Sequence, residues 1–231
     1  VDPRRFGPYA TRGYLKEKNE EAYANVFTTH YPDEERSAAR PLKTAPCYDR
    51  MKALGAVFGS VYGWERPNWF MPSADYSLSV EELNQEDPAK VLMNKNHATA
   101  LEDGRIVEKN SFRRSNYFEH VGNECKHVND KVGLLDMSAF AKCIVKGPGA
   151  EEWLEYIFAN KMPKAIGRIS LVHMLSLNGG VRAEFTVYKT GPQSYYLVSA
   201  GAFETHDHDY LFKLAPKDGS VNIQRVTTQT G

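Results

Sequence analysis

Residues 169–189 read ISLVHMLSLNGGVRAEFTVYK, a pattern typical of two antiparallel strands joined by a tight turn. Two apolar runs flank Asn178-Gly179-Gly180, and glycine adopts the positive backbone angles that a tight turn between antiparallel strands needs. After the turn, apolar and polar residues alternate from Val181 to Lys189, which is typical of a strand with one buried face. The stretch therefore predicts a β-hairpin made of Ile169–Ser176 and Val181–Lys189.

Strand and helix patterns continue on both sides of this hairpin. The further predicted elements are a strand at Phe140–Lys146, a helix opened by Gly147-Pro148-Gly149, a strand at Tyr195–Ser199, a helix at Glu204–Leu214 and a strand at Val221–Val226. In the first helix, Trp153, Leu154, Ile157 and Phe158 should face inward. The order β-α-β-β-β-α-β predicts an α+β fold, a mostly antiparallel sheet with helices on one face.

The first half of the chain shows weaker patterns. A helix is expected over residues 14–27, with Leu15, Ala22, Tyr23, Val26 and Phe27 on its buried side and charged residues outward. Prolines interrupt residues 31–48, which should be an extended connector. Residues 71–110 have no sustained period and are interpreted as an excursion or linker.

A stronger helical pattern follows that linker. Phe118, Val121, Cys125, Val128 and Val132 recur at three- and four-residue steps, and Gly133 should end the helix. This spacing places the five side chains on one stripe. We therefore expect the stripe to be buried, with Cys125 as a thiol in the core.

Composition excludes several classes of partner. The chain has 29 Lys plus Arg and 29 Asp plus Glu in 231 residues, so no overall field favours nucleic acid or an anionic membrane. Its three cysteines form no C-x-x-C pair, which argues against structural zinc or a disulfide scaffold and favours a reducing compartment. No apolar run approaches the roughly 18 residues of a membrane-spanning helix. Val1 in place of Met suggests a fragment of a longer protein.

Two polar clusters are candidates for chemistry. On the strand after the turn, Glu184 shares one face with Arg182, Thr186 and Tyr188, an arrangement that also suits a plain outward polar face. The other cluster is residues 206–209, His-Asp-His-Asp, whose side chains diverge at the start of a helix. We expect no metal there, and helix capping by Thr205 or Asp207 explains the cluster better.

Aromatic residues are dense in two segments, GWERPNWF at residues 63–70 and SFRRSNYFE at residues 111–119. Flat aromatic bodies with polar edges either line pockets for planar ligands or form a core seam, and the residues alone leave both open. With GLLDMSAFAK at residues 133–142, these segments resemble the dimethylglycine dehydrogenase and sarcosine dehydrogenase family. In that family a flavin oxidoreductase is fused to a folate-binding aminomethyltransferase domain.

The resemblance implies a division into three parts. Residues 1–70 are similar to the connector that leaves the central domain of the flavin oxidoreductase, and DPRRFG at residues 2–7 carries this likeness. Residues 71–110 would be the linker. Residues 111–231 resemble the N-terminal half of the aminomethyltransferase-type folate-binding fold, related to the T-protein of the glycine cleavage system.

The resemblance also implies site residues. Glu184 matches the second acid of a pair that follows a Gly-Gly hairpin and binds the folate nitrogen, although Ala183 replaces the first acid and Glu replaces the Asp of T-proteins. Ser199 stands where T-proteins have Asn, and it either hydrogen-bonds the pterin edge or simply ends a strand. Met174 and Leu175 match an apolar pair near the ligand, whereas strand spacing alone favours a core position.

The implied function is demethylation of an N-methyl amine of the dimethylglycine or sarcosine type, with the one-carbon unit captured on tetrahydrofolate. Glu184 would be the catalytic carboxylate. FAD is expected only in the oxidoreductase half, which lies outside this chain. The expected partners are the folate and amine substrates, that flavin half, and the C-terminal half of the folate domain on the same or an associated chain.

Two further expectations follow from the resemblance. The isolated chain should have weak or no activity, and the compartment should be a bacterial cytoplasm or the mitochondrial matrix. The alternative to an enzyme is a non-catalytic folate-binding or assembly module with the same fold.

Overall fold

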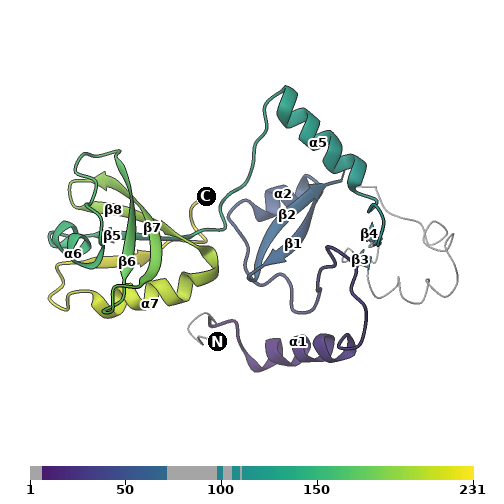
Figure 1. Ribbon diagram of the computed structural model, residues 1–231, viewed down its shortest axis with the longest axis horizontal. Helices are drawn as coiled ribbons and strands as arrows, with labels where there is room; N and C mark the ends of the chain where they lie inside the picture. Colours follow the sequence, from purple (N-terminus) through teal and green to yellow (C-terminus); the bar gives the residue numbers. More distant parts are fainter. Residues whose placement is uncertain (1–6, 72–97, 101–105, 110) are drawn as a thin grey trace, which may run out of the picture. The chain divides into compact units, whose positions relative to one another are not determined.

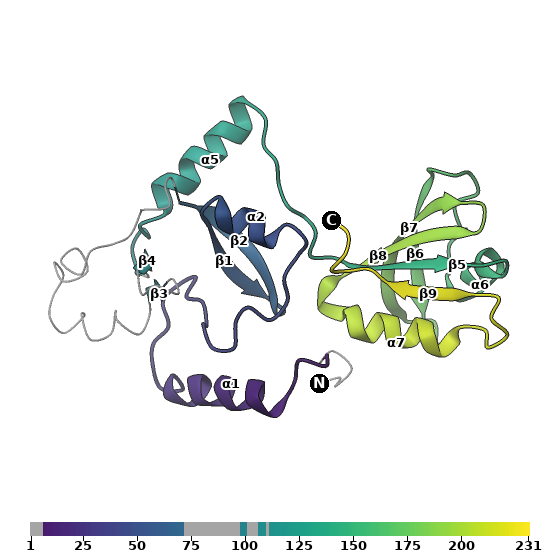
Figure 2. The ribbon, with the colours of Figure 1, turned by 180° about the vertical axis from the view of Figure 1, so that it is seen from behind.

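The computed structural model describes residues 7–71, 98–100, 106–109 and 111–231 (Figures 1 and 2). The chain divides into two compact units. The N-terminal unit comprises residues 11–136, and the C-terminal unit comprises residues 1–10 and 137–231. Most of the predicted linker lies outside the described residues, and the parts of it that are described include two short antiparallel strands, β3 (Ala98–Ala100) and β4 (Ile106–Lys109).

One antiparallel sheet of five strands, in the order β6-β7-β8-β5-β9, forms the C-terminal unit (Figure 2). Its elements are β5 (Ala141–Lys146), α6 (Ala150–Ile157), β6 (Ile169–Leu175), β7 (Val181–Gly191), β8 (Ser194–Ser199), α7 (Glu204–Leu214) and β9 (Asn222–Arg225). The predicted order of strands and helices is confirmed. The predicted hairpin is β6 and β7, and Gly179 in its turn has a φ of 78°.

Both helices of this unit pack on the same face of the sheet. Trp153 and Leu154 of α6 and Leu211 of α7 share one core with inward-facing strand residues such as Val145 and Phe185. The Trp153 indole N–H also donates a hydrogen bond of 3.0 Å to the carbonyl of Leu214 at the end of α7. The predicted α+β fold with helices on one face is therefore confirmed.

A polar cluster fixes the start of α6 against the sheet. The Glu151 carboxylate accepts hydrogen bonds from the Lys189 ammonium and the Tyr195 hydroxyl, both at 2.7 Å, and from Lys164 at 2.9 Å. These hydrogen bonds lower the pKa of Glu151 to about 2, and the hydrogen bond from Lys189 has the largest effect. Because Lys189 lies on β7 and Tyr195 on β8, one carboxylate connects a helix to two strands.

The opposite face of the sheet is partly covered by the last residues of the chain. Lys142 on β5 is buried there, and its ammonium donates to the carbonyls of Ser138, Thr227 and Thr230, the last at 2.8 Å. The Tyr196 hydroxyl lies 2.8 Å from the Thr230 hydroxyl. Over β6 and β7 this face is more open, and Leu171 is 51% exposed.

In the N-terminal unit, a hairpin of β1 (Ala56–Val61) and β2 (Trp64–Phe70) is accompanied by α1 (Arg12–Ala24), α2 (Tyr48–Ala53) and α5 (Phe118–Asp130). Trp64 and Trp69 are buried, so the aromatic stretch at residues 63–70 is a core seam. Arg40 holds the buried Glu65 carboxylate through two hydrogen bonds of 2.9 and 2.7 Å. As expected, residues 31–47 form no helix and no strand, and their one regular contact is an isolated bridge from Lys43 to Trp64.

The expected burial of the α5 stripe is wrong. None of the residues of α5 is buried, Cys125 is exposed, and the helix ends at Asp130 rather than at Gly133. The helix meets the hairpin mainly through its first half, where Trp69 stacks on His120 with ring centroids 5.6 Å apart and Glu124 accepts a hydrogen bond from the Phe70 N–H. The apolar side chains of its second half therefore have no surface in the described part of this unit to pack against.

The expected orientation of α1 is also wrong. Its apolar side chains point outward, with Tyr23 82% exposed, and no residue of the helix is buried. The helix is held instead by its polar side, where the Glu21 carboxylate accepts a 2.8 Å hydrogen bond from the Ala38 N–H. The helix also ends at Ala24, so Val26 and Phe27 lie beyond it and not on its surface as expected.

Gly147 offers a first test of the fold. Its φ is 133°, and a Cβ at this position would collide with the carbonyl oxygen of Ser220. We expect Gly147→Ala to lower the free energy of unfolding by about 1–3 kcal/mol. Chemical denaturation would measure the change. Gly191→Ala is the control, because its Cβ would make only an ordinary contact with Ser194; equal losses in both variants would contradict the steric explanation.

His208 offers a test by pH. This α7 residue is fully buried, and burial lowers its pKa from 6.5 to about 4. The unfolded chain therefore binds more protons between these two values, so the contribution of His208 to stability is complete above pH 6.5 and is lost as the pH falls to about 4. We expect a loss of on the order of 3 kcal/mol over this range.

The free energy of unfolding of His208→Gln, measured at several pH values, should lack the loss that the wild type shows between pH 6.5 and about 4. Leu211→Ala, which removes a buried apolar side chain from the same helix, should be destabilised but keep it. If the wild-type and His208→Gln curves ran parallel between pH 6.5 and 4, the assignment to His208 would be wrong.

Candidate functional site

A cavity of about 490 Å³ lies in the C-terminal unit where β7 extends past the end of β8. Thr186 pairs with Val198, and β8 ends one residue later at Ser199, so the first residues of β7 have no strand on that side. The chain instead turns through the short helix η2 (Gly201–Phe203) into α7. The cavity is lined by Phe140, Arg182, Ala183, Glu184, Thr186, Val198, Ser199, Ala200, Phe203, His206 and Asp207.

Glu184 supplies the most accessible charge of this cavity. It lies on the open face of β7, opposite His173 on β6, and its side chain is 59% exposed. The His173 Nε2 and Glu184 Oε2 atoms are 3.1 Å apart. His173 on β6 therefore contacts one of the two carboxylate oxygens of Glu184. Glu184 thus has the position that the sequence predicted, on a strand face that borders a cavity.

Ser199 and Asp207 contribute buried polar groups. Ser199 is 5% exposed, and its Oγ lies near the Asp207 carboxyl but makes no hydrogen bond of standard geometry. Asp207 is 1% exposed, and its Oδ1 lies 2.9 Å from the His206 Nδ1. Burial raises the pKa of Asp207, while His206 and Ser199 act in the opposite direction. Ser199 thus places a buried hydroxyl in the wall of the cavity, beside the Asp207 carboxyl.

The predicted capping role of this cluster is wrong. The helix α7 begins at Glu204 with Phe203 at its N-cap and no side-chain cap hydrogen bond, so Thr205 and Asp207 both lie inside the helix. The reason is that η2 leads directly into α7 and starts the helix before these residues. Among the described residues no group of three metal-ligating side chains lies together, and the expected absence of a metal stays a prediction.

Arg182 is the cavity residue that sequence reasoning placed wrongly. A register shift between Met174 and Leu175 makes Arg182 the extra residue of a bulge in β7, which breaks the alternation of this strand. The guanidinium lies over the Tyr210 ring of α7, with its carbon 4.0 Å from the ring centroid. It therefore points to the helix side of the sheet and not to the face of Glu184. A bulge depends on pairing with the neighbouring strand, so alternation alone could not reveal it.

The other two predicted ligand residues are elsewhere. Met174 is fully buried in the core between the sheet and its helices, and Leu175 lies on β6 beyond the bulge. Neither lines the cavity. The structure thus brings Glu184 and Ser199 together and leaves Met174 and Leu175 apart from them, so a ligand role for this apolar pair stays a prediction.

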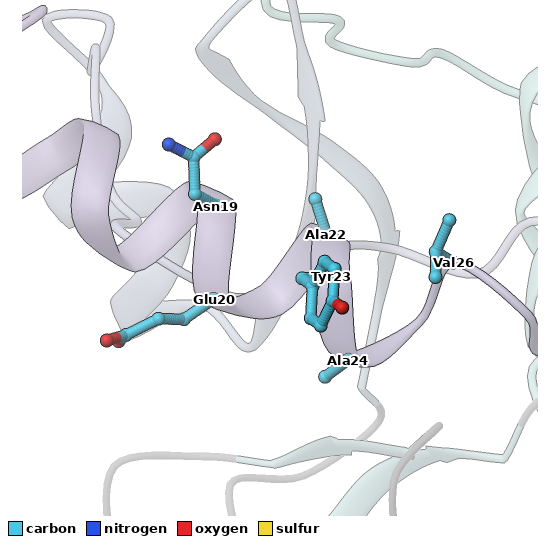
Figure 3. A pocket seen from close by; sticks show the side chains of 6 residues that line it. All are labelled: Asn19, Glu20, Ala22, Tyr23, Ala24 and Val26. Atoms are coloured by element: carbon cyan, nitrogen blue, oxygen red, sulfur yellow. The ribbon is translucent and has the colours of Figure 1, made fainter.

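A second hollow lies beside α1 in the N-terminal unit (Figure 3). It is lined by Asn19, Glu20, Ala22, Tyr23, Ala24 and Val26. Figure 3 shows that these side chains point in different directions from the C-terminal part of α1 and from the residues that follow it. Because no polar groups converge there, the cavity beside Glu184 is the better candidate for a functional site.

Comparison with known protein families identifies the fold. The model described as the GCVT N-terminal domain matches residues 47–231, which is most of the chain. The chain belongs to the GCVT N-terminal domain family. A second model, the FAD dependent oxidoreductase central domain, matches residues 1–45. The resemblance expected from the residues is thereby confirmed.

Several individual proteins are similar to this GCVT-family chain. Mitochondrial dimethylglycine dehydrogenase of Mus musculus is 33% identical over 100% of this chain and 23% of its own length. The mitochondrial pyruvate dehydrogenase phosphatase regulatory subunit of Mus musculus is 28% identical over 98% of this chain and 23% of its own length. The crystal structure of the glycine cleavage system aminomethyltransferase T of Bartonella henselae aligns with a TM-score of 0.49 and 20% identity, covering 80% of this chain and 38% of that one.

The GCVT-family chain therefore spans less than a quarter of the length of these curated relatives. None of the helices that the structure describes is both long and apolar enough to cross a membrane.

Ser199 gives a test of the cavity in the absence of ligand. Its buried hydroxyl has no hydrogen bond, so Ser199→Ala should change the free energy of unfolding by less than about 0.5 kcal/mol. Thr227→Val is the contrasting variant, because the Thr227 hydroxyl accepts a 3.0 Å hydrogen bond from the buried Lys142 N–H; it should cost about 1–3 kcal/mol. Denaturant unfolding measures both, and a large loss in Ser199→Ala would show that its hydroxyl is already bonded.

Proposed function

We propose that the C-terminal unit forms part of a folate-binding cleft in which Glu184 acts on tetrahydrofolate during capture of a one-carbon unit. One observation carries the proposal. In a chain of the GCVT N-terminal domain family, the Glu184 carboxylate and the Ser199 hydroxyl line the same cavity. These are the two polar residues that the family resemblance assigns to the folate, and they come from different strands.

The residues of the cavity fit such a ligand. A pteridine ring has a flat apolar body with hydrogen-bonding edges, and the cavity combines Phe140 and Phe203 with the unpartnered hydroxyl of Ser199. Tetrahydrofolate, when bound, supplies the nitrogen nucleophile that takes up the one-carbon unit. Glu184 would accept a hydrogen bond from the ligand nitrogen or its proton, since a carboxylate is a suitable general base. His173 would keep the Glu184 carboxylate oriented toward the cavity.

The wider activity proposed for the full-length protein is oxidative demethylation of an N-methyl amine of the dimethylglycine or sarcosine type. Support comes from the similarity to dimethylglycine dehydrogenase and from the match of residues 1–45 to an FAD dependent oxidoreductase central domain. FAD, the remaining oxidoreductase part and the C-terminal half of the folate domain would lie outside this chain, on the same or an associated polypeptide. The isolated chain would accordingly have weak or no activity.

The division of the chain and its location are proposed in the same way. Residues 1–70 would be the connector, residues 71–110 the linker and residues 111–231 the folate-binding part. A mitochondrial matrix location is supported by the names of similar proteins, which include the word mitochondrial. A bacterial cytoplasm is the other expected compartment.

Glu184→Gln in the full-length protein tests the proposed role. The amide keeps the size of the side chain but is neither charged nor basic. We expect the yield of methylene-tetrahydrofolate to fall by roughly 10²-fold or more, as for loss of a general base, while flavin reduction by the amine stays unchanged. Stopped-flow absorbance follows the flavin, and chromatography quantifies the folate product.

Glu152→Gln is the matched control for this experiment. Glu152 is an exposed residue on α6 that does not line the cavity, so both readouts should stay at wild-type values. An unchanged folate product in Glu184→Gln would exclude the proposed role. A parallel loss of flavin reduction would indicate a general defect and not a defect of folate chemistry.

The second candidate function is a non-catalytic folate-binding or assembly module. The observation that favours it is the similarity to a protein named as a regulatory subunit, which extends over almost the whole chain. Tetrahydrofolate binding without formation of methylene-tetrahydrofolate, in the full-length protein supplied with amine substrate, would support the module. Turnover that depends on Glu184 would support the enzyme.

A further inference from the structure

Arg182 is a cavity residue to which the proposed function gives no task. It enters the same cavity as Glu184 and Ser199, but from the helix side of the sheet, because the bulge in β7 turns it toward α7. Bulges of this kind often redirect a side chain beside a functional site. The side chain is thus placed by the pairing of two strands and not by the flexibility of a loop.

The guanidinium is held in place without an anionic partner in contact with it. Its carbon lies over the Tyr210 ring, 4.0 Å from the ring centroid, which is a favourable cation–π contact. Its Nε atom is buried and has no hydrogen-bond partner, and among the described residues no carboxylate makes an ion pair with it. A buried donor without an acceptor is unfavourable, so a ligand oxygen at this point would satisfy it.

The carboxylates nearest in the cavity do not take that role. Asp207 is close enough to interact electrostatically with Arg182, but its Oδ1 is 2.9 Å from His206 Nδ1 and no ion pair joins it to the guanidinium. Glu184 lies on the opposite face of the strand and is in contact with His173. Among the described residues, the guanidinium of Arg182 therefore has a donor, Nε–H, without a hydrogen-bond acceptor.

We propose that Arg182 forms a carboxylate-binding subsite of the cavity, separate from the folate contacts of Glu184 and Ser199. Planar guanidinium groups bind carboxylates through two parallel hydrogen bonds, and the described residues offer Arg182 no such partner. Two sources of a carboxylate are compatible with the proposed function, on which this inference rests. One is the amino acid that donates the one-carbon unit, and the other is the glutamate tail of the folate.

The Arg182 Nε–H resonance in a ¹⁵N NMR spectrum of the chain tests the subsite directly. Its assignment comes from its loss in Arg182→Gln. We expect the resonance to move on titration with N,N-dimethylglycine if the donor is the source, and with p-aminobenzoyl-glutamate if the folate tail is the source. N,N-Dimethylethanolamine, which has a hydroxyl in place of the carboxylate, should leave it unmoved. A resonance that responds to neither carboxylate would overturn the proposal.

Affinity measurements give a second readout that does not depend on this assignment. Calorimetry should show at least a roughly tenfold weaker Kd for the responding carboxylate in Arg182→Gln, as expected for loss of a charge-assisted pair, and partial recovery in Arg182→Lys. Arg168→Gln, at an exposed arginine outside the cavity, should keep the wild-type Kd. Equal Kd values in wild type and Arg182→Gln would reject the subsite.

The outcome separates this inference from the proposed function. Carboxylate binding that depends on Arg182, together with a Glu184→Gln variant of normal folate yield, would retain the subsite and reject the folate role of Glu184. Loss of folate product in Glu184→Gln, together with no effect of Arg182→Gln on any carboxylate, would retain the folate role and reject the subsite.

Discussion

Burial of one face of the five-stranded sheet beneath α6 and α7 determines where the polar residues of the C-terminal unit can lie. Successive side chains of a strand point to opposite faces, so packing Phe185 and Val187 into the core commits Glu184 and Thr186 to the other side. The same packing requires α7 to start soon after β8, because Leu211 must reach the core. The strand therefore ends early, and the cavity occupies the space beside β7.

Local signals were sufficient to predict the strands and helices of this unit. Glycines at the turn after β6, alternation in β7 and the apolar stripe of α6 each act within a few residues, and all three elements have the predicted kind and order. The placement of Glu184 on the face away from the core follows from the same alternation. Only the family resemblance assigns Ser199 to a ligand, since nothing in its spacing distinguishes a ligand contact from the end of a strand.

The features that sequence reasoning missed depend on pairing and on neighbouring elements. Arg182 leaves its predicted face because β6 and β7 shift register at that point. Both α1 and α5 end before the last residues of the predicted stripes, and periodicity indicates which side chains share a face but not whether the unit offers a surface to cover them. Cys125 and Tyr23 consequently remain exposed, and the helices are held by polar and aromatic contacts.

The contacts of Lys142 have a consequence for behaviour in acid. Its ammonium is bound by the carbonyl oxygens of Ser138, Thr227 and Thr230, and peptide carbonyls do not take up protons in the range where carboxylates do. The hydrogen bonds from Lys142 on β5 to residues 227–230 thus persist at a pH that protonates Glu151. Protonation of Glu151 weakens its bonds to the sheet and releases the start of α6. Acidification should loosen this unit from its helical side first, with the strand that carries Lys142 still attached to the terminal residues.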